Sequence, residues 1–256
     1  MIQVKVKQFD YVQLADSGQA FRMMEDGTCI AMDKVCRVIG NTIECPKDDN
    51  AFWKEYFDLN TDYSKFIKAI DKKDKFLTAA ADFGFGIRIL KQDPWEMLIT
   101  YIISQRRSIP SIKTCVERIC KKWGKKLTGT KYYSFPTPKQ LSKATMDELL
   151  ECGLGYRAEY VYLATKLVAS GQLKLEDLAK FSYDELIEEL LKLKGVGIKV
   201  ANCVALFGYH KIEAFPVDVW IARIEDQHYK GHFPVDKYPG FAGVLQQYMF
   251  YFVRKN

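Results

Sequence analysis

The chain has 256 residues, of which 48% are hydrophobic and 27% are charged, and this balance excludes an intrinsically disordered protein. Lysine and arginine exceed aspartate and glutamate by six (38 against 32), a mild excess that is compatible with a polyanionic partner but does not identify one. The seven cysteines are scattered and form no Cys-x-x-Cys pair, and no apolar run approaches the ~18 residues of a membrane span. We therefore expect a globular protein with free thiols in a reducing, cytosolic setting, without a membrane partner.

The first part of the chain is predicted to form short strands. Residues from Ile2 to Phe9 alternate between apolar and polar, and the pairs Asp26-Gly27 and Gly40-Asn41 supply turn chemistry. Further strands are predicted at Phe21–Met24, Cys29–Met32, Val35–Ile39 and Thr42–Cys45. This pattern indicates an antiparallel sheet with one buried face.

From about Ala51 onward the hydrophobic period becomes helical. Asp93 and Pro94 are typical of an N-cap followed by the first helical position. Two capping boxes, Thr145–Glu148 and Ser182–Glu185, precede amphipathic stretches. Other helices are predicted at residues 112–123, 156–169, 200–207, 219–229 and 243–253.

These elements predict an α+β protein with two parts. An N-terminal antiparallel sheet domain with flanking helices takes residues 1–84, and a mostly α-helical region takes residues 85–256. The boundary falls at the segment Gly84-Phe85-Gly86, where the strand-like and helical patterns meet.

A Gly-x-Gly turn, Gly195 to Gly197, lies between two helical patterns. Glycines let the backbone approach another chain closely, and the free N–H groups that begin the next helix form a grip for phosphate. Backbone carbonyls of the same turn could hold a monovalent cation. Lys199 follows in the first turn of the helix, and Asp218 lies 19 positions further on (218 − 199).

Lysine and aspartate at these places are suited to chemistry on nucleic acid. The helix dipole disfavours the charged ammonium of Lys199, and a neutral amine is what nucleophilic attack at a sugar carbon requires. Asp218 at a helix N-terminus can cap free N–H groups, remain ionised and face developing positive charge. The simpler alternatives are a lysine that contacts phosphate and an aspartate that is only a cap.

At these residues the chain resembles the helix–hairpin–helix (HhH-GPD) glycosylase superfamily, and within it the 8-oxoguanine DNA glycosylases. Four blocks resemble those of the family in the same order: Ser17–Arg22, Ile89–Glu96, Gly153–Ala158 and Gly195–Cys203. The resemblance covers nearly the whole chain. It implies a sheet domain packed on two helical subdomains, with the hairpin near residues 194–198 and the active site in the cleft.

The resemblance also implies an enzyme, a bifunctional DNA glycosylase that is also an AP (abasic-site) lyase. Lys199 would attack the sugar C1′, release the base and form a Schiff base that permits β-elimination. Asp218 would stabilise the oxocarbenium-like transition state. Gly195 and Gly197 would hold the DNA backbone, and the target base must leave the stack to be reached.

Four further positions match the family's pocket for the damaged base. The Gly18 carbonyl would accept the N7–H that distinguishes 8-oxoguanine from guanine. Gln246 would read the Watson–Crick edge, and Phe250 and Cys203 would sandwich the ring. Taken singly, these residues are more simply interpreted as a turn glycine, a solvated helix residue, a core aromatic and a buried cysteine.

The DNA contacts implied by the resemblance involve both strands. Tyr156 would wedge into the gap left by the flipped base, Arg157 would contact the orphaned cytosine, and Arg106 would also bind DNA. Trp220 stands where eukaryotic members carry a phosphate-contacting histidine, so it either contacts the backbone or only packs. The implied partner is double-stranded DNA containing 8-oxoguanine, bound by a monomer in the cytoplasm near the nucleoid of a prokaryote or in the nucleus of a eukaryote.

Rival enzymes of the same superfamily fit less well. Endonuclease III-like and adenine-specific glycosylases carry an iron–sulfur loop after the aspartate, whereas no cysteine follows Cys203 here. We expect no cofactor apart from a cation at the hairpin. The three histidines show no metal-ligand spacing, so no metal site is expected. The remaining alternative is a catalytically silent HhH DNA-binding module, which the presence of both Lys199 and Asp218 disfavours.

One block departs from the family pattern and generates a prediction. Arg106 replaces an asparagine, and Ser111 replaces a second arginine that reads the opposite base. The pattern therefore predicts looser discrimination of the opposite base, measured as excision rates opposite each of the four bases. A preference for cytosine as strict as that of full-pattern enzymes contradicts it.

Overall fold

The computed structural model describes residues 1–256, which fold as two compact units. The sheet-containing unit comprises Met1–Cys29, Cys36–Lys91 and His210–Asn256, and the helical unit comprises Ile30–Val35 and Gln92–Tyr209. Both units are discontinuous in the sequence. The division at residue 84 that the sequence indicates is a boundary along the chain, and it stays a prediction.

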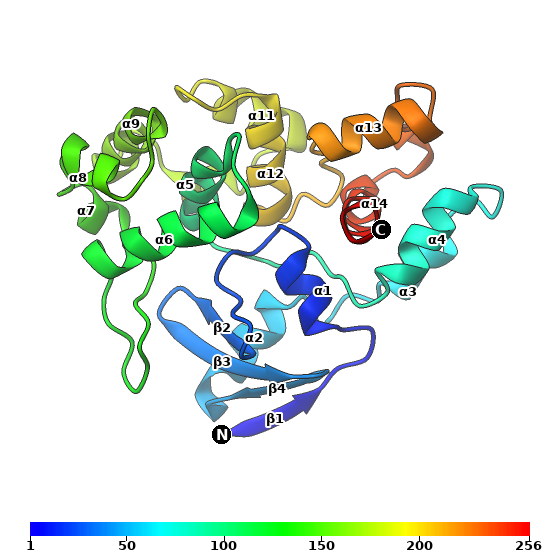
Figure 1. The fold of residues 1–256 in the computed structure, drawn as a ribbon, viewed down its shortest axis with the longest axis horizontal. Helices are drawn as coiled ribbons and strands as arrows, with labels where there is room; N and C mark the ends of the chain where they lie inside the picture. Colours follow the sequence, from blue (N-terminus) through cyan, green and yellow to red (C-terminus); the bar gives the residue numbers. More distant parts are fainter. The chain divides into compact units, whose positions relative to one another are not determined.

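The N-terminal sheet has four strands in the order β1-β4-β3-β2 (Figure 1). The strands are β1 (Ile2–Lys5), β2 (Thr28–Ala31), β3 (Lys34–Ile39) and β4 (Thr42–Cys45). β4 pairs antiparallel with both β1 and β3. Alternate residues of β3, Cys36 and Val38, are buried while Arg37 is exposed, so one face of the strand is covered. The predicted antiparallel sheet is confirmed.

Two details of this region differ from the sequence prediction. Phe21–Met24 is not a strand, since only Met23 forms an isolated bridge, to Cys29. Phe21, Arg22 and Met23 are consecutive buried residues, so this segment does not alternate between faces as a half-buried strand must. The chain also contains a short helix that the sequence analysis did not predict, α1 (Tyr11–Asp16), which the Asp10 side chain caps.

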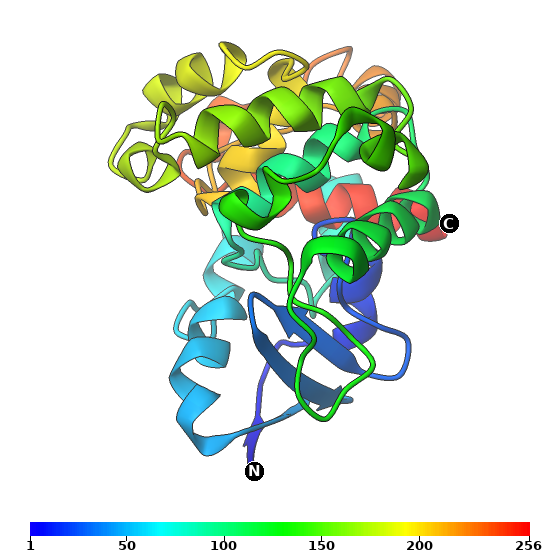
Figure 2. The same ribbon diagram turned by 90° about the vertical axis from the view of Figure 1, so that its left-hand side faces the viewer.

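The remaining elements are helices, as predicted. The sheet-containing unit holds α2 (Asn50–Tyr56), α3 (Ser64–Lys68), α4 (Lys75–Phe83), α13 (Val219–His228), α14 (Ala242–Lys255) and two 3₁₀ turns at Lys47–Asp49 and Val235–Lys237. The helical unit, green to yellow in Figures 1 and 2, holds α5 (Pro94–Ser104), α6 (Ile109–Trp123), α7 (Pro138–Leu141), α8 (Met146–Glu151), α9 (Arg157–Ala169), α10 (Leu175–Leu178), α11 (Tyr183–Leu191) and α12 (Ile198–Gly208). Within it α5 packs on α12, where the rings of Tyr101 and Phe207 stack with centroids 5.5 Å apart.

The helix-start signals in the sequence are confirmed. The Asp93 carboxylate accepts the backbone N–H of Glu96, and Pro94 occupies the first turn of α5. Both capping boxes are complete, at the starts of α8 and α11, with each side chain bonded to the backbone of the other residue. These caps satisfy N–H groups that the helices themselves leave unpaired.

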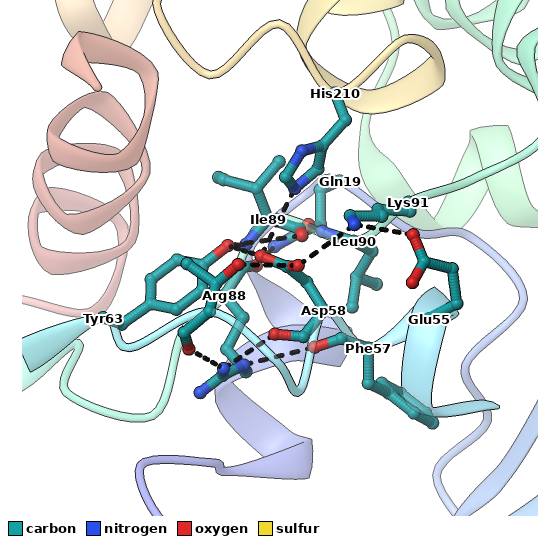
Figure 3. A network of polar contacts seen from close by, with 11 residues as sticks. Gln19, Glu55, Phe57, Asp58, Tyr63, Arg88, Ile89, Leu90, Lys91 and His210 are labelled. Carbon is teal, nitrogen blue, oxygen red and sulfur yellow. Dashed lines mark hydrogen bonds and ion pairs between the residues drawn. The ribbon is translucent and has the colours of Figure 1, made fainter. Parts of the chain in front are cut away.

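A buried carboxylate organises the polar interior of the sheet-containing unit (Figure 3). Asp58 is 1% exposed and accepts hydrogen bonds of 2.9 Å from the hydroxyls of Thr61 and Tyr63. Its carboxylate lies 3.3 Å from Lys91 Nζ and 3.5 Å from His210 Nε2. Burial raises the pKa of Asp58, but His210 and the two hydroxyls outweigh burial, so the pKa lies below its ordinary value.

Arg88 completes this network by donating to backbone. Its guanidinium bonds to the carbonyls of Gln8, Phe57, Asp58 and Thr61 and lies 4.5 Å from the centre of the Tyr63 ring. These carbonyls belong to irregular segments, and a buried carbonyl without a partner is costly. Arg88 therefore fixes the loop after α2 against residues 88–91.

Replacement of Asp58 by asparagine tests this network. We expect Asp58→Asn to lower the free energy of unfolding at pH 7 by roughly 2–4 kcal/mol, since it removes a buried carboxylate that accepts from the hydroxyls of Thr61 and Tyr63 and pairs with Lys91. The depressed pKa means that the contribution of Asp58 is complete above its unfolded-state pKa of about 4 and is lost as the pH falls further. The difference between wild type and variant should therefore shrink below about pH 4. Urea denaturation across pH 3–7 measures it.

Asparagine is a clean substitution, because it tolerates the left-handed backbone of position 58 (φ 50°). The matched control is Asp82→Asn, which removes an exposed carboxylate from α4 in the same unit. Equal stability losses in the two variants would contradict the assigned role.

Candidate active site

The turn between α11 and α12 contains two glycines with different physical requirements. Gly195 has φ +84°, and a Cβ at this position would lie 2.3 Å from ring atoms of Tyr160. The fold of the chain therefore requires a glycine at position 195. Gly197 is the N-cap of α12 with φ −94°, and a Cβ there would meet no atom within 4 Å. Packing within the chain does not explain the absence of a side chain at Gly197.

A side chain that the sequence analysis missed holds this turn. Gln105, directly after α5, donates from Nε2 to the carbonyls of Gly195 and Ile102, both at 3.0 Å. The carbonyl of Leu193 accepts the N–H of Val196 at 3.0 Å, so two carbonyls of the turn have partners within the chain. The only sign of this role in the sequence was the place of Gln105 directly after a predicted helix. The cation at the turn stays a prediction.

Lys199 lies in the first turn of α12 and is half-buried. Its Nζ is 5.4 Å from the centre of the Tyr101 ring, and it makes no ion pair. Cys203, one turn further along α12, is 3% exposed. Residues four apart share a face of a helix, so the amine and the thiol lie on the same side of α12.

Asp218 is the N-cap of α13, in the sheet-containing unit. Its Oδ1 accepts the backbone N–H groups of Trp220 at 3.0 Å and Ile221 at 2.9 Å. The cap predicted for this residue is present. The neighbouring Trp220 is 38% exposed, and the guanidinium of Arg223 lies 5.4 Å from its ring centre.

One face of α14 connects the segment before Asp218 with the end of α1. Gln246 donates from Nε2 to the Pro216 carbonyl at 3.0 Å, and two turns later Arg254 donates to the Asp16 carbonyl at 2.7 Å. Phe250 lies on the intervening turn of the same face, 5.2 Å from the Arg254 guanidinium. Within this unit, Gln246 and Phe250 therefore belong to one continuous surface of α14.

Gly18 follows α1 and has φ +75°. It lies between Ser17 and Gln19, which are both 0% exposed. The Gln19 amide donates to the Arg88 carbonyl and accepts the N–H of Leu90, both at 2.9 Å (Figure 3). It also donates to the Ser17 hydroxyl at 2.9 Å. The sequence analysis missed this anchor, which fixes the backbone on either side of Gly18.

The expected strand-contacting residues of the helical unit differ in exposure. Tyr156 is 51% exposed, whereas Arg157 is 6% exposed and donates to the carbonyls of Gln105 and Leu154. The Arg157 guanidinium lies 4.3 Å from the Tyr156 ring centre. Arg106 is exposed and has a left-handed backbone, with φ 51°. The base contacts expected of these residues stay predictions.

Two other types of site were searched for. No group of three or more histidine, cysteine or acidic side chains is arranged to hold a metal ion. None of the helices combines the length and apolar character that crossing a bilayer requires.

Comparison with known families identifies the family to which this chain belongs. Residues 99–232, more than half of the chain, match the model of the HhH-GPD superfamily of base excision DNA repair proteins. The chain belongs to this superfamily. Residues 1–98 match the N-terminal domain of 8-oxoguanine DNA glycosylase. The family and the fold class implied by the sequence resemblance are thus confirmed.

Individual relatives agree with this assignment. The chain is 32% identical to a probable N-glycosylase/DNA lyase of Methanothermobacter thermautotrophicus, over 78% of this chain and 73% of the relative. The structure of MBOgg1 with a low-affinity DNA ligand has a TM-score of 0.91 at 36% identity, over 99% and 95% of the two chains. Clostridium acetobutylicum 8-oxoguanine glycosylase/lyase, with double-stranded DNA containing cytosine opposite 8-oxoG, has a TM-score of 0.90 at 37% identity, over 98% and 93%.

The two glycines of this HhH-GPD hairpin are expected to respond differently to alanine. Gly195→Ala should lower the free energy of unfolding by roughly 2–4 kcal/mol, because the methyl group meets Tyr160 and φ is positive. Gly197→Ala should change it by less than about 1 kcal/mol, as for an exposed N-cap. Thermal unfolding followed by circular dichroism measures both. Similar losses in the two variants would show that the Tyr160 contact does not constrain the turn.

Proposed function

We propose that this protein excises 8-oxoguanine from duplex DNA and then cleaves the strand, with Lys199 as nucleophile and Asp218 as electrostatic partner. The observation that carries the proposal is the position of Lys199 at the start of α12. The glycine loop before this helix leaves open space at Gly197. Close approach of a DNA backbone is a reason for that open space. The amine then lies within one turn of the phosphate grip.

The surroundings of Lys199 suit a nucleophilic amine. It is half-buried against the Tyr101 ring and has no carboxylate partner to stabilise its charged form. Attack at a sugar carbon uses the lone pair of the neutral amine. In the proposed step the N–C1′ bond to lysine forms as the bond from C1′ to the base breaks. The C1′–O4′ bond then breaks as O4′ takes a proton from the lysine nitrogen, which gives a Schiff base. Loss of a proton from C2′ then expels the 3′ phosphate by β-elimination.

Asp218 is proposed to act without forming a covalent bond. Two backbone N–H groups donate to Oδ1, which leaves Oδ2 free of these bonds. A fixed negative charge stabilises the positive charge that develops on the sugar as the base departs. Because the cap holds the carboxylate in place, little reorganisation is needed during the reaction.

The proposed reading of the damaged base uses backbone and amide groups. The Gly18 carbonyl would accept the N7–H of 8-oxoguanine, and guanine, which has a lone pair there, would lose roughly 1–3 kcal/mol. One amide N–H of Gln246 donates to the Pro216 carbonyl, and the Gln246 side-chain oxygen accepts one hydrogen bond from the Gln247 amide. One donor and one acceptor remain, which suffices for a base edge. Phe250 and Cys203 would cover the ring.

The named relatives support this substrate. The Clostridium acetobutylicum protein, 37% identical over 98% of this chain, is an 8-oxoguanine glycosylase/lyase whose structure contains double-stranded DNA. We extend the same partner to this protein, with DNA-backbone contacts from Gly195, Gly197 and Trp220. Monomeric action and a monovalent cation at the turn are part of the proposal. A catalytically silent DNA-binding module is the competing function, and it forms no covalent adduct.

Borohydride trapping on duplex DNA containing 8-oxoguanine tests the proposal. The wild type should give a covalent adduct that Lys199→Gln abolishes, because no other amine is proposed to reach C1′. Asp218→Asn should bind DNA but react slower by about two to three orders of magnitude. Lys180→Gln, which removes an exposed lysine outside the site, should trap like the wild type.

The outcomes separate the parts of the proposal. Absence of an adduct with the wild type would refute the lyase activity, and an adduct that persists in Lys199→Gln would refute the assigned nucleophile. Release of free 8-oxoguanine, measured apart from strand cleavage, identifies the substrate independently. Release of unmodified guanine at a similar rate would refute the role of Gly18.

A further inference from the structure

Positive charge is concentrated in α6 and in the loop that follows it. Residues 113–133 contain seven lysines and arginines against one glutamate, which gives this segment a formal charge of +6. The whole chain has the same formal charge of +6, so the charges of all other residues balance one another. Charge gathered in one segment in this way is typical of a surface that binds a polyanion.

Most cations of this segment have no acidic partner within the chain. Five are exposed and form no ion pair: Arg118, Lys121, Lys125, Lys126 and Lys131. Lys122 differs from them, since its Nζ lies 3.0 Å from Glu151 Oε2 and 3.3 Å from Glu148 Oε1. The five unpaired charges are therefore available to an anion from outside the chain.

Two of the five charges line a pocket of about 400 Å³ between the end of α6 and the end of α8. Its lining consists of Arg118, Lys121, Lys122, Glu151 and Cys152. Lys122 already pairs with the one carboxylate, so the pocket retains the charges of Arg118 and Lys121. These two residues are three apart in α6 and therefore lie on one face of the helix. The chemistry of this lining suits an anionic group.

The other three charges lie on the loop between α6 and α7, residues 124–137, which projects from the helices of its unit (Figure 1). The two sides of this loop are bonded to each other. The N–H of Leu127 donates to the Tyr132 carbonyl at 2.9 Å, and Lys126 forms an isolated bridge with Tyr133. The loop therefore holds its lysines on a paired backbone that continues the positive surface beyond α6.

The pocket lies close to a residue that is expected to meet DNA. Arg107 donates to the Gly153 carbonyl, and a Cβ at Gly153 would lie 3.0 Å from Arg118 Nη1, so the loop before α9 is held against α6. Tyr156 follows Gly153 by three residues, and its Cα is therefore at most about 11 Å from that of Gly153. A DNA strand advances about 3.4 Å per nucleotide, so this distance corresponds to about three nucleotides.

We propose that Arg118, Lys121, Lys125, Lys126 and Lys131 form a second DNA contact, which binds the sugar–phosphate backbone outside the lesion site. The inference rests on the proposed function, since it places a duplex against Tyr156. An acidic protein could also satisfy these charges, but a duplex held at Tyr156 already passes within a few phosphates of the pocket. Backbone contacts carry no sequence information, so this surface holds damaged and undamaged DNA alike. It takes no part in the excision step.

Binding of an undamaged duplex at several salt concentrations, followed by fluorescence anisotropy, tests the inference. The triple variant Lys121→Gln, Lys125→Gln and Lys126→Gln should raise the Kd at low salt by roughly tenfold or more. The slope of log K against log salt should become shallower by about 2–3, because each lost phosphate contact removes about 0.9.

Single-turnover excision of 8-oxoguanine by the same variant separates binding from chemistry. The enzyme concentration for half-maximal rate should rise by a factor similar to that of the Kd. The maximal rate at saturating enzyme should equal that of the wild type, since the lost contacts hold substrate and transition state equally.

The matched control is the triple variant Lys65→Gln, Lys72→Gln and Lys73→Gln, which removes the same charge from exposed lysines of the sheet-containing unit. Its Kd should stay within about threefold of the wild type, because salt screens charges that do not contact the DNA. Thermal unfolding of both triple variants checks that each remains folded.

Three results would overturn the inference: equal weakening by the two triple variants, an unchanged Kd and salt slope in the α6 variant, or a lower maximal excision rate in that variant. The second result would assign the surface to another anion, such as an acidic protein. Failure of the proposed function differs from all three, because the wild type then releases no 8-oxoguanine and forms no trapped adduct.

Discussion

Hydrogen bonds from buried side chains to backbone carbonyls hold the irregular segments of this protein in place. A loop has no ladder partner for its carbonyls, and each buried one must find a donor elsewhere. Arg88 provides donors for four carbonyls, and Gln19 and Gln105 bridge segments that are far apart in the sequence. The turns that carry the candidate site residues depend on these few amide and guanidinium groups.

In the candidate site, side chains and backbone groups come from different kinds of segment. Side chains with proposed chemical roles, such as Lys199 and Asp218, lie at helix starts, where the backbone is regular and the helix dipole acts on them. Backbone groups with proposed binding roles come from glycines in the anchored loops, such as Gly18 and Gly197. Regular helices and anchored loops both limit movement, and a site must be held closely to its productive geometry.

Much of the fold could be predicted because its signals are local. An N-cap, a capping box and a Gly-x-Gly turn each involve residues within four positions of one another, so the starts of α5, α8, α11 and α13 were predicted correctly. The six-residue α1 was missed because so short a helix shows no period of its own. Phe21–Met24 was wrongly predicted as a strand because hydrophobic character alone does not distinguish a buried connection from a strand.

The site residues were less accessible to local reasoning. Lys199 and Asp218 attract attention singly, but their roles came from the resemblance to a family. The anchors Gln19, Gln105 and Arg107 could not be predicted, since their partners lie 69, 90 and 46 residues away in the sequence. A long polar side chain in a loop is ordinary until the carbonyl it reaches is known.

The burial of every cysteine has a practical consequence for following this protein in solution. All seven native thiols are covered, including Cys203 in α12. A cysteine introduced at the exposed position 197 would be the one thiol open to a maleimide dye or a disulfide cross-linker, and the surrounding space accommodates its side chain. The hairpin can thus carry a single chemical label two residues from Lys199 without first removing the native cysteines.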